Sequence, residues 1–219
     1  MCDPDSGRVL LTLEGHANSV SGVAVTPDGK RAVSAARDNM LKVCDLDSGH
    51  SIRTLEGHGD WVFGVAVTPD GKRAISASDD QTQVWDLRSG RELRTLTGHT
   101  RGANAVAVTL DGKRAISASR DETLKVWELA SGRELRTLEG HSSYVEAVAV
   151  TPDGQRAISA SFDNSVKLWD LETGAVVATF TCDAAARCCA FSDALKLIIA
   201  GDAGGHVHFL RLEEPKPKI

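Results

Sequence analysis

Three sets of side chains in this sequence have the residue types of a hydrolase triad. In each set a histidine is followed 18 residues later by a serine, and four residues after that by an aspartate. The sets are His58, Ser76 and Asp80; His99, Ser117 and Asp121; and His141, Ser159 and Asp163. In a triad the histidine takes the serine proton and the aspartate orients the histidine. Because a hydrolase needs one exposed nucleophile beside one oxyanion hole, three near-identical copies favour a structural role and predict no enzymatic activity.

These sets belong to an internal repeat that covers nearly the whole chain. The string Thr-Leu-Glu-Gly-His starts at residues 12, 54 and 137, Thr-Leu-Thr-Gly-His starts at 95, and a decayed copy, Thr-Phe-Thr-Cys-Asp, starts at 179. The first threonines of these strings are 42, 41, 42 and 42 residues apart. The sequence therefore contains five units, at about 8–49, 50–90, 91–132, 133–174 and 175–212.

Each unit is expected to fold into four short antiparallel strands. β-branched stretches alternate with turn residues, as in Pro69-Asp70-Gly71-Lys72, where proline presets φ and glycine accepts positive φ. Strands such as Ala-Ile-Ser-Ala-Ser are apolar or small on both faces, so both faces of each sheet are expected to be covered. Four-stranded sheets stacked around an axis achieve this, and the predicted fold is an all-β propeller of five blades.

The units resemble those of the WD-repeat propeller family. The resemblance rests on the Gly-His dipeptide, the serine and aspartate at fixed offsets, and a closing Trp-Asp, and it extends from about residue 8 to 212. The last unit, from Arg187 to Leu212, resembles the terminal blade of propellers attached to bacterial signal-transduction ATPases of the STAND type.

The family resemblance implies a buried relay that runs from tryptophan through serine and histidine to aspartate. The tryptophans of the three complete sets are Trp85, Trp127 and Trp169. An indole N–H only donates hydrogen bonds, serine and histidine both donate and accept them, and a carboxylate ends the chain as an acceptor. Such a satisfied network is expected to stabilise each blade by roughly 1 kcal/mol per bond.

Three units depart from the pattern. The first keeps His16, Ser34 and Asp38 but has Cys44 at the tryptophan position. The second is one residue shorter between Asp80 and Trp85, so its hairpin is expected to be tighter or to change register. The fifth has lost the whole network and carries Asp183, Ala200, Gly204 and Leu210.

The two ends of the repeat array are complementary. Residues 8–14 align with the fourth strand of a unit, whereas the last copy stops after its third strand. We therefore expect one domain, residues 1–214, to be a ring that the N-terminal strand closes by completing the last blade, followed by a short tail at 215–219. A fragment of a larger propeller, or one part of a ring built from several chains, would show the same pattern.

Candidate partner-binding residues are those that differ between otherwise similar units. By resemblance to the family, they lie on the rim around the central channel, and aromatic and arginine side chains are typical interface anchors. The candidates are Trp61, Phe63, Tyr144, Glu146, Phe162, Arg37, Arg120 and Asp79.

Composition excludes several other classes. The net charge of −5 disfavours nucleic acid, and no apolar run is long enough to span a membrane. The residues Met1 to Asp5 lack the basic and apolar character of a secretory signal, so we expect none. The five cysteines form no disulfide framework, and those near His206 and His208 match no zinc spacing, so small buried side chains are expected in place of a metal site. We expect a cytoplasmic, monomeric protein without cofactors.

The sequence thus favours a non-catalytic scaffold or sensor that binds a protein or peptide on the loop face around the channel. A lectin-like propeller that binds a sugar or small molecule is one alternative, because aromatic platforms also suit sugars. A regulatory subunit of a separately encoded effector is another, suggested by the character of the last unit.

Overall fold

Antiparallel sheets make up the described part of the chain. The computed structural model describes residues 11–211, and within that range every regular element is a strand. Residues 8–10 at the start of the first expected unit, residue 212 at the end of the fifth, and the expected tail at 215–219 lie outside the described residues. Among residues 11–211 there is no helix with the length and apolar character that crossing a membrane requires.

We number the sheets as blades 1 to 5 in chain order. Blade 1 contains β1 (Val20–Val25), β2 (Arg31–Ala36), β3 (Met40–Asp45) and β4 (Ser51–Glu56). Blade 2 contains β5 (Val62–Val67), β6 (Arg73–Ser78), β7 (Thr82–Asp86) and β8 (Glu92–Leu96). Blade 3 contains β9 (Ala103–Val108), β10 (Arg114–Ser119), β11 (Leu124–Glu128) and β12 (Glu134–Leu138). Blade 4 contains β13 (Val145–Val150), β14 (Arg156–Ser161), β15 (Ser165–Asp170) and β16 (Val176–Thr181). Blade 5 contains β17 (Ala186–Ser192), β18 (Leu197–Asp202) and β19 (Val207–Arg211).

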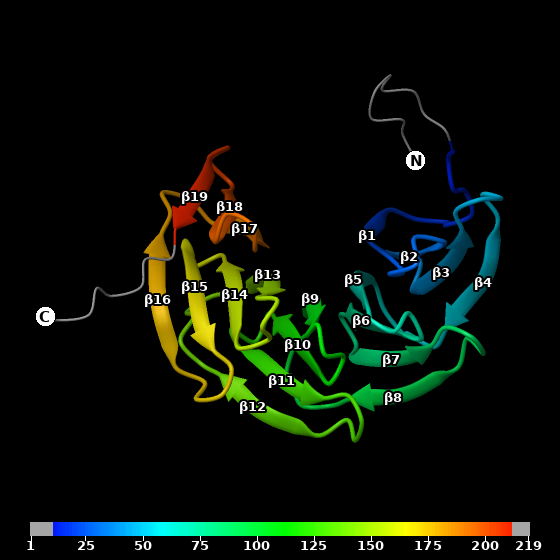
Figure 1. The fold of residues 1–219 in the computed structure, drawn as a ribbon, viewed down its shortest axis with the longest axis horizontal. Helices are drawn as coiled ribbons and strands as arrows, with labels where there is room; N and C mark the ends of the chain where they lie inside the picture. Colours follow the sequence, from blue (N-terminus) through cyan, green and yellow to red (C-terminus); the bar gives the residue numbers. More distant parts are fainter. Residues whose placement is uncertain (1–10, 212–219) are drawn as a thin grey trace, which may run out of the picture.

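Every blade is a meander in which each strand pairs with the next one along the chain. The first strands, β1, β5, β9, β13 and β17, lie innermost and contact one another in sequence, and the fourth strands lie on the outside (Figure 1). The prediction of an all-β propeller with five blades is confirmed. Antiparallel order places two kinds of loop on one face, which we call the upper rim: those entering each inner strand, and those joining second and third strands.

The Pro-Asp-Gly turns close the opposite face and fix the register of the first two strands. In blade 2 the Thr68 hydroxyl donates to Asp70 over 2.6 Å, the backbone N–H of Thr68 donates to the carbonyl of Arg73, and Gly71 adopts a φ of +66°. The same arrangement recurs around Thr26, Thr109 and Thr151. Blade 3 has Leu110 at the proline position but keeps the same hydrogen bonds. Because these bonds recur in blades 1 to 4, the residues at the other end of each strand are held at equivalent heights.

The hydrophobic core consists of slabs between consecutive blades. Between blades 1 and 2, Val33 and Leu41 pack against Val62 and Trp85, and all four are fully buried. Trp127 and Trp169 occupy equivalent slabs against the blades that precede them. Packing against the neighbouring blade therefore stabilises each blade, because burial of these apolar side chains is the main favourable term.

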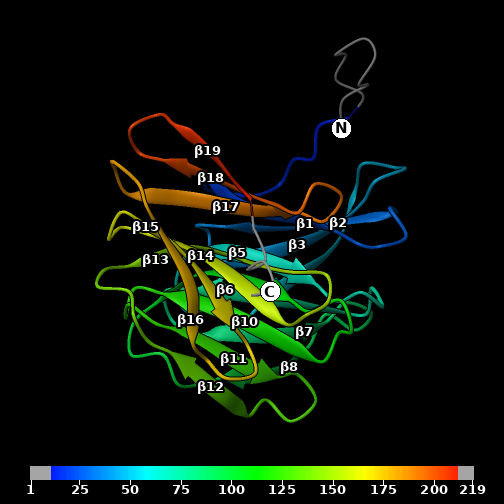
Figure 2. The same cartoon turned by 60° about the vertical axis from the view of Figure 1, so that its left-hand side comes forward.

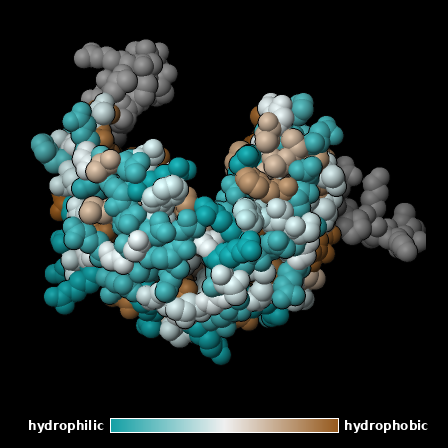
Figure 3. All heavy atoms as spheres, turned by 180° about the vertical axis from the view of Figure 1, so that it is seen from behind, coloured by the Kyte–Doolittle hydropathy of each residue, from teal (hydrophilic) through white to brown (hydrophobic). Residues whose placement is uncertain are grey.

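The described residues form an open arc, with blades 1 and 5 at its two ends (Figure 1). In the turned view the strands of blades 1 and 5 lie in the upper part of the molecule, and β11 and β12 of blade 3 lie at the bottom (Figure 2). A wide notch separates these ends in the space-filling view (Figure 3). Val23 on blade 1 and Phe209 on blade 5 are each 66% exposed, whereas Val62, which faces a neighbouring blade, is 0% exposed. Within the described residues β19 pairs with β18 alone. Residues 11–14 form no strand beside β19. Because residues 8–10 lie outside the described range, closure of the ring by residues 8–14 stays a prediction.

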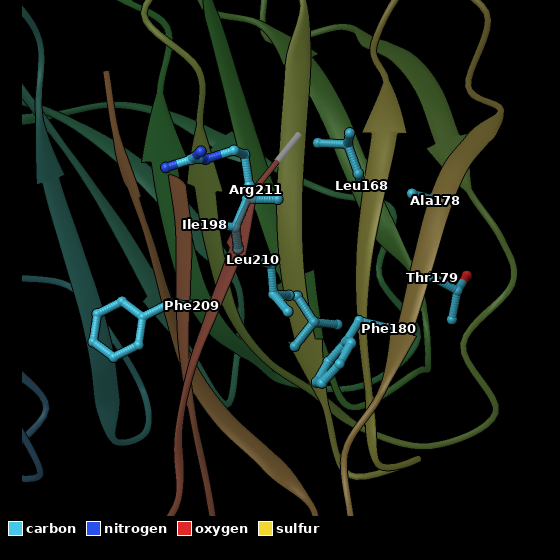
Figure 4. Close-up of a pocket in the computed structure, with 9 residues that line it drawn as sticks. Leu168, Ala178, Thr179, Phe180, Ile198, Phe209, Leu210 and Arg211 are labelled. Atoms are coloured by element: carbon cyan, nitrogen blue, oxygen red, sulfur yellow. The ribbon is translucent and has the colours of Figure 1, made fainter. Parts of the chain in front are cut away.

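A groove lies beside β19, where blade 5 has no fourth strand within residues 11–211. The cavity has a volume of about 350 Å³ and lies between β15 and β16 of blade 4 and β18 and β19 of blade 5. Leu168, Phe180 and Leu210 face one another across it, whereas Phe209 points to the opposite side of β19 (Figure 4). At the other end of the arc, the side chain of Leu11 packs against Gly49 as Arg53 packs against Gly90. Arg53 belongs to β4, the outer strand of blade 1, and contacts the turn of blade 2. Leu11 contacts the turn of blade 1 in the same way, so it occupies the position that the outer strand of a preceding blade would have.

Candidate functional site

The His, Ser, Asp and Trp side chains meet in the interior of blades 2, 3 and 4. In blade 3 the indole nitrogen of Trp127 donates to Ser117 Oγ over 2.8 Å, Ser117 Oγ lies 2.7 Å from His99 Nε2, and His99 Nδ1 lies 2.8 Å from Asp121 Oδ2. Because a carboxylate only accepts hydrogen bonds, His99 donates one to Asp121 from Nδ1 and accepts one from the Ser117 hydroxyl at Nε2.

Blades 2 and 4 repeat the arrangement. The indole of Trp85 donates to Ser76 over 2.8 Å, and His58 connects Ser76 to Asp80 through contacts of 2.6 and 2.7 Å. In blade 4 the corresponding residues are Trp169, Ser159, His141 and Asp163, with contacts of 2.8, 2.7 and 2.7 Å. All three serines are 0% exposed, so their hydroxyls cannot reach a substrate. These sets tie the loop, the second strand and the third strand of each blade together.

The charge state of these relays follows from burial and hydrogen bonding. Burial lowers the pKa of His58 and of His141, and their aspartate partners offset this only in part, so both imidazoles are neutral near pH 7. Burial alone would raise the pKa of Asp121, but hydrogen bonds from His99 and Thr123 hold it well below its usual range. The relays of blades 2 and 4 are therefore carboxylates bound by a neutral imidazole.

Blade 1 has an incomplete relay. His16 contacts Ser34 at 2.7 Å and Asp38 at 2.9 Å, but buried Cys44 stands where the other blades hold tryptophan. A cavity of about 400 Å³ opens there, lined by Leu13, His16, Val23, Ser34, Cys44 and neighbouring side chains. Ser34 thus lacks the indole donor that the other three serines have.

The shorter second unit tightens its turn and keeps its register. Trp85 pairs with Ala74 as Trp127 pairs with Ala115. The turns of blades 1, 3 and 4 contain a residue with positive φ, namely Asn39, Glu122 and Asn164. No non-glycine residue of blade 2 in the described range has a positive φ. The residue that the second unit lacks is therefore the turn residue that has the left-handed conformation in the other three blades.

The candidate partner-binding residues lie on the upper rim, where one half forms a cluster around Phe63. Trp61 and Phe63 meet edge to face, with ring centroids 6.4 Å apart. The Arg37 guanidinium lies 4.9 Å from the Trp61 ring centroid, and the Arg120 guanidinium lies 4.7 Å from that of Phe63. Arg120 also forms an ion pair of 2.6 Å with Asp79. We call Arg37, Trp61, Phe63, Asp79 and Arg120 the Trp61 cluster.

A second group, the Tyr144 cluster, occupies the rim of blades 3 to 5. It comprises Arg101, Tyr144, Phe162 and Arg187. Tyr144 stacks on Phe162 with centroids 6.1 Å apart, while Arg187 and Arg101 lie 4.1 and 5.9 Å from the Phe162 and Tyr144 centroids.

Asn104 and Glu146 connect the two clusters. Asn104 accepts a hydrogen bond from Arg120 Nε over 3.0 Å and donates to a Glu146 carboxylate oxygen over 3.0 Å. Glu146 also lies 4.0 Å from the Arg187 guanidinium, and burial raises the pKa of its carboxyl. Cations and aromatic rings therefore alternate across the rim of all five blades.

The residues that face the channel share a backbone irregularity. In all five blades the pairing register shifts near the start of the inner strand, which leaves one residue of that strand without a cross-strand partner. These residues are Ser21, Phe63, Asn104, Glu146 and Arg187. A β-bulge redirects the side chain of its extra residue, and here it brings the first four into a common cavity of about 510 Å³ with Arg37 and Arg120.

Sequence comparison missed Arg101 and Arg187. Phe63 follows the histidine of its unit by five residues, and the same count from Asp183 in the last unit leads to Cys188. The loop of blade 5 is one residue shorter, however, so the residue equivalent to Phe63 is Arg187. Arg101 comes from a loop in which the copies differ at several positions, and no spacing singles it out. Cys188, expected to be buried, is exposed because it lies on the free face of blade 5, whereas Cys182 is buried and burial raises the pKa of Cys189 to about 12.

Comparison with known proteins agrees with this geometry. A family model described as "WD domain, G-beta repeat" matches residues 7–45, 49–86 and 90–128, which together exceed half of the chain. The chain belongs to the WD-repeat family. A model of the TEP-1 C-terminal beta-propeller matches residues 141–212, so propeller models cover both halves. No curated protein matched the chain. WD-repeat propellers generally act as non-catalytic scaffolds that bind other proteins.

Proposed function

We propose that this WD-repeat propeller binds a segment of a partner protein across its upper rim, in contact with both the Trp61 and the Tyr144 clusters. The alternation of arginine and aromatic side chains along the upper rim, where Arg37, Phe63 and Arg120 line the 510 Å³ cavity, is the observation that supports this function. Aromatic and arginine side chains are the most frequent energetic anchors of protein interfaces. Because these side chains already hold one another in place, binding orders few of them and loses little entropy.

The charges of the rim favour a partner segment with a carboxylate next to an apolar side chain. Arg120 is paired with Asp79, but Arg37 has no ion-pair partner among residues 11–211. A guanidinium that lies on an aromatic face keeps its N–H edge free, and this edge matches a carboxylate in a bidentate pair. Phe63, which lines the same cavity as Arg37, offers an apolar contact beside that guanidinium.

The test is selection of binding peptides from a phage-displayed library of random short peptides. The wild-type chain is expected to enrich sequences with an acidic residue next to an aromatic or aliphatic one. A selected peptide should bind the double variant Arg37→Ala/Trp61→Ala at least tenfold more weakly, as measured by fluorescence anisotropy. Loss of two anchors of this kind commonly costs more than 1.4 kcal/mol, or a factor of ten.

The matched control removes one cation and one large apolar side chain from the opposite face. Lys72 and Leu110 are exposed in turns of blades 2 and 3, and Lys72→Ala/Leu110→Ala should bind the peptide as the wild type does. Equal weakening in both variants would overturn the proposal. So would sugar binding on a glycan array that requires Trp61 in the absence of any peptide ligand.

A further inference from the structure

Blade 5 replaces the lost relay with a different group of polar side chains. Cys182 follows β16, Asp202 ends β18 and His208 lies in β19. In blades 2, 3 and 4 the position of Cys182 is held by Gly57, Gly98 and Gly140; that of Asp202 by Ser78, Ser119 and Ser161; and that of His208 by Gln83, Lys125 and Lys167. The last blade alone has three side chains that can donate an electron pair to a metal ion at these places.

The three donor atoms converge on one point. The Cys182 Sγ, an Asp202 carboxylate oxygen and a His208 ring nitrogen all lie within 4.8 Å of one another. His208 Nε2 is 3.0 Å from Asp202 Oδ2, and His206 Nδ1 is 3.3 Å from the same oxygen. Zinc bonds of about 2.0 to 2.3 Å place neighbouring ligand atoms of a tetrahedral site roughly 3.3 to 3.8 Å apart. Small side-chain rotations therefore suffice to bring all three atoms to coordination distance.

The surrounding contacts hold the carboxylate in the required orientation. The Asp202 side chain is 0% exposed, and its Oδ1 accepts hydrogen bonds from the backbone N–H groups of Gly204 and His206 over 2.9 and 3.0 Å. This leaves Oδ2 directed at the imidazoles. The N–H of Cys182 donates to the carbonyl of Asn164 over 2.7 Å, and the Phe180 ring lies 5.1 Å from that of His208. Contacts of this kind orient metal ligands before a metal binds.

We propose that Cys182, Asp202 and His208 bind a divalent transition-metal ion of borderline softness, with Zn²⁺ as the best match. Thiolate, imidazole and carboxylate together are typical zinc ligands, and His206 or water completes the tetrahedron. The ion joins the segment after β16 to β18 and β19. It thereby secures the blade whose sheet has three strands in the described residues and no fourth.

Cobalt(II) provides the direct probe, because a thiolate ligand gives it a near-ultraviolet charge-transfer band and tetrahedral geometry gives it strong visible bands. The full-length reduced chain, first stripped with a chelator, is titrated with Co²⁺ and then with Zn²⁺. One equivalent of Co²⁺ should produce both sets of bands, and Zn²⁺ should abolish them by displacement. Cys182→Ser should remove the charge-transfer band, and His208→Gln should weaken binding at least tenfold, as expected for loss of a ligand.

The exposed Cys188 supplies the matched control. Cys188→Ser should keep all bands, and their loss in that variant but not in Cys182→Ser would overturn the proposal. A second measurement requires no folded variant: in the wild type, Zn²⁺ should slow alkylation of Cys182 by iodoacetamide at least tenfold and leave that of Cys188 unchanged, as read by peptide mass spectrometry. Equal alkylation of Cys182 with and without Zn²⁺ would show that the group is a hydrogen-bond network only.

Discussion

The indole nitrogen of Trp127 lies 2.8 Å from the hydroxyl oxygen of Ser117, and both side chains are fully buried. This bond is the first link of a chain that reaches the rim at Asp121, so a residue at the blade interface is coupled to the loop that supports Arg120. In blade 1 the same place is held by Cys44, and the chain begins at Ser34. The difference between these blades makes the contribution of the link measurable.

Trp127→Phe should destabilise the chain more than Cys44→Ala. The phenylalanine leaves Ser117 buried without its donor and opens a space beside the preceding blade, for an expected loss of roughly 2 to 3 kcal/mol. Cys44→Ala removes one sulfur atom from a site that is already bordered by a cavity, for a loss of about 1 kcal/mol or less. Urea unfolding followed by circular dichroism gives both values, and the reverse order would refute the assignment of the relay.

Cys44→Trp should stabilise blade 1. The adjoining cavity of about 400 Å³ has room for an indole, whose N–H would reach Ser34 as Trp127 reaches Ser117. The expected gain is about 1 kcal/mol, the usual net value of a buried hydrogen bond. Cys44→Phe is the control, since it fills the same space without the donor. If both variants have the same urea midpoint, the hydrogen bond adds nothing at this position.

Stability should fall as the pH is lowered through about 6.5. Burial lowers the pKa of His58 and His141 in the folded state, so near pH 6 the unfolded chain binds more protons than the folded chain does. Excess proton binding by the unfolded state makes stability increase with pH, and each histidine contributes at most about 1.4 kcal/mol per pH unit.

Urea unfolding at pH 7.5 and 5.5 provides the measurement. The loss between these pH values should be smaller in His141→Gln than in the wild type, because one of the two histidines is gone. A wild-type stability that is flat or higher at pH 5.5 would contradict the buried neutral state. A further loss is expected below about pH 4, where the relay aspartates with lowered pKa values take up protons in the unfolded chain first.

The exposed faces of blades 1 and 5 predict that the chain associates with itself as its concentration rises. Val20, Val23 and Val25 at one end and Val207 and Phe209 at the other are all more than half exposed. Contiguous apolar surface of this kind commonly marks an interaction site. Analytical ultracentrifugation should show species heavier than 23.3 kDa, and Phe209→Glu should shift them toward the monomer.

Leu110→Glu is the control for this prediction, because Leu110 is equally exposed but lies in a turn away from both faces. It should leave the mass distribution unchanged. A wild-type monomer at every concentration would contradict the prediction, and is the result that a ring closed by residues 8–14 would give.

The repeat made the strands and turns predictable, because period, turn residues and β-branched stretches are local signals. The geometry of the rim was less accessible. Arg187 reaches the position of Phe63 through a shortened loop, which a fixed count of residues misplaces. Asp202 escaped attention because its counterparts in other blades are serines, and only the folded sheet brings it beside Cys182 and His208. Contacts between blades depend on residues roughly forty positions apart, which no short pattern specifies.

The open arc also has a direction. Blade 1 presents the face that elsewhere carries the tryptophan, and blade 5 presents the face that elsewhere receives it, so the two ends are unlike surfaces. An association of one copy's blade 5 with another copy's blade 1 is head-to-tail, so this contact joins two different surfaces and is not one surface meeting its own copy. Each added copy covers one exposed blade face and brings another face of the same kind. Growth of such an assembly therefore stops only when the rotation between successive copies brings the last copy into contact with the first.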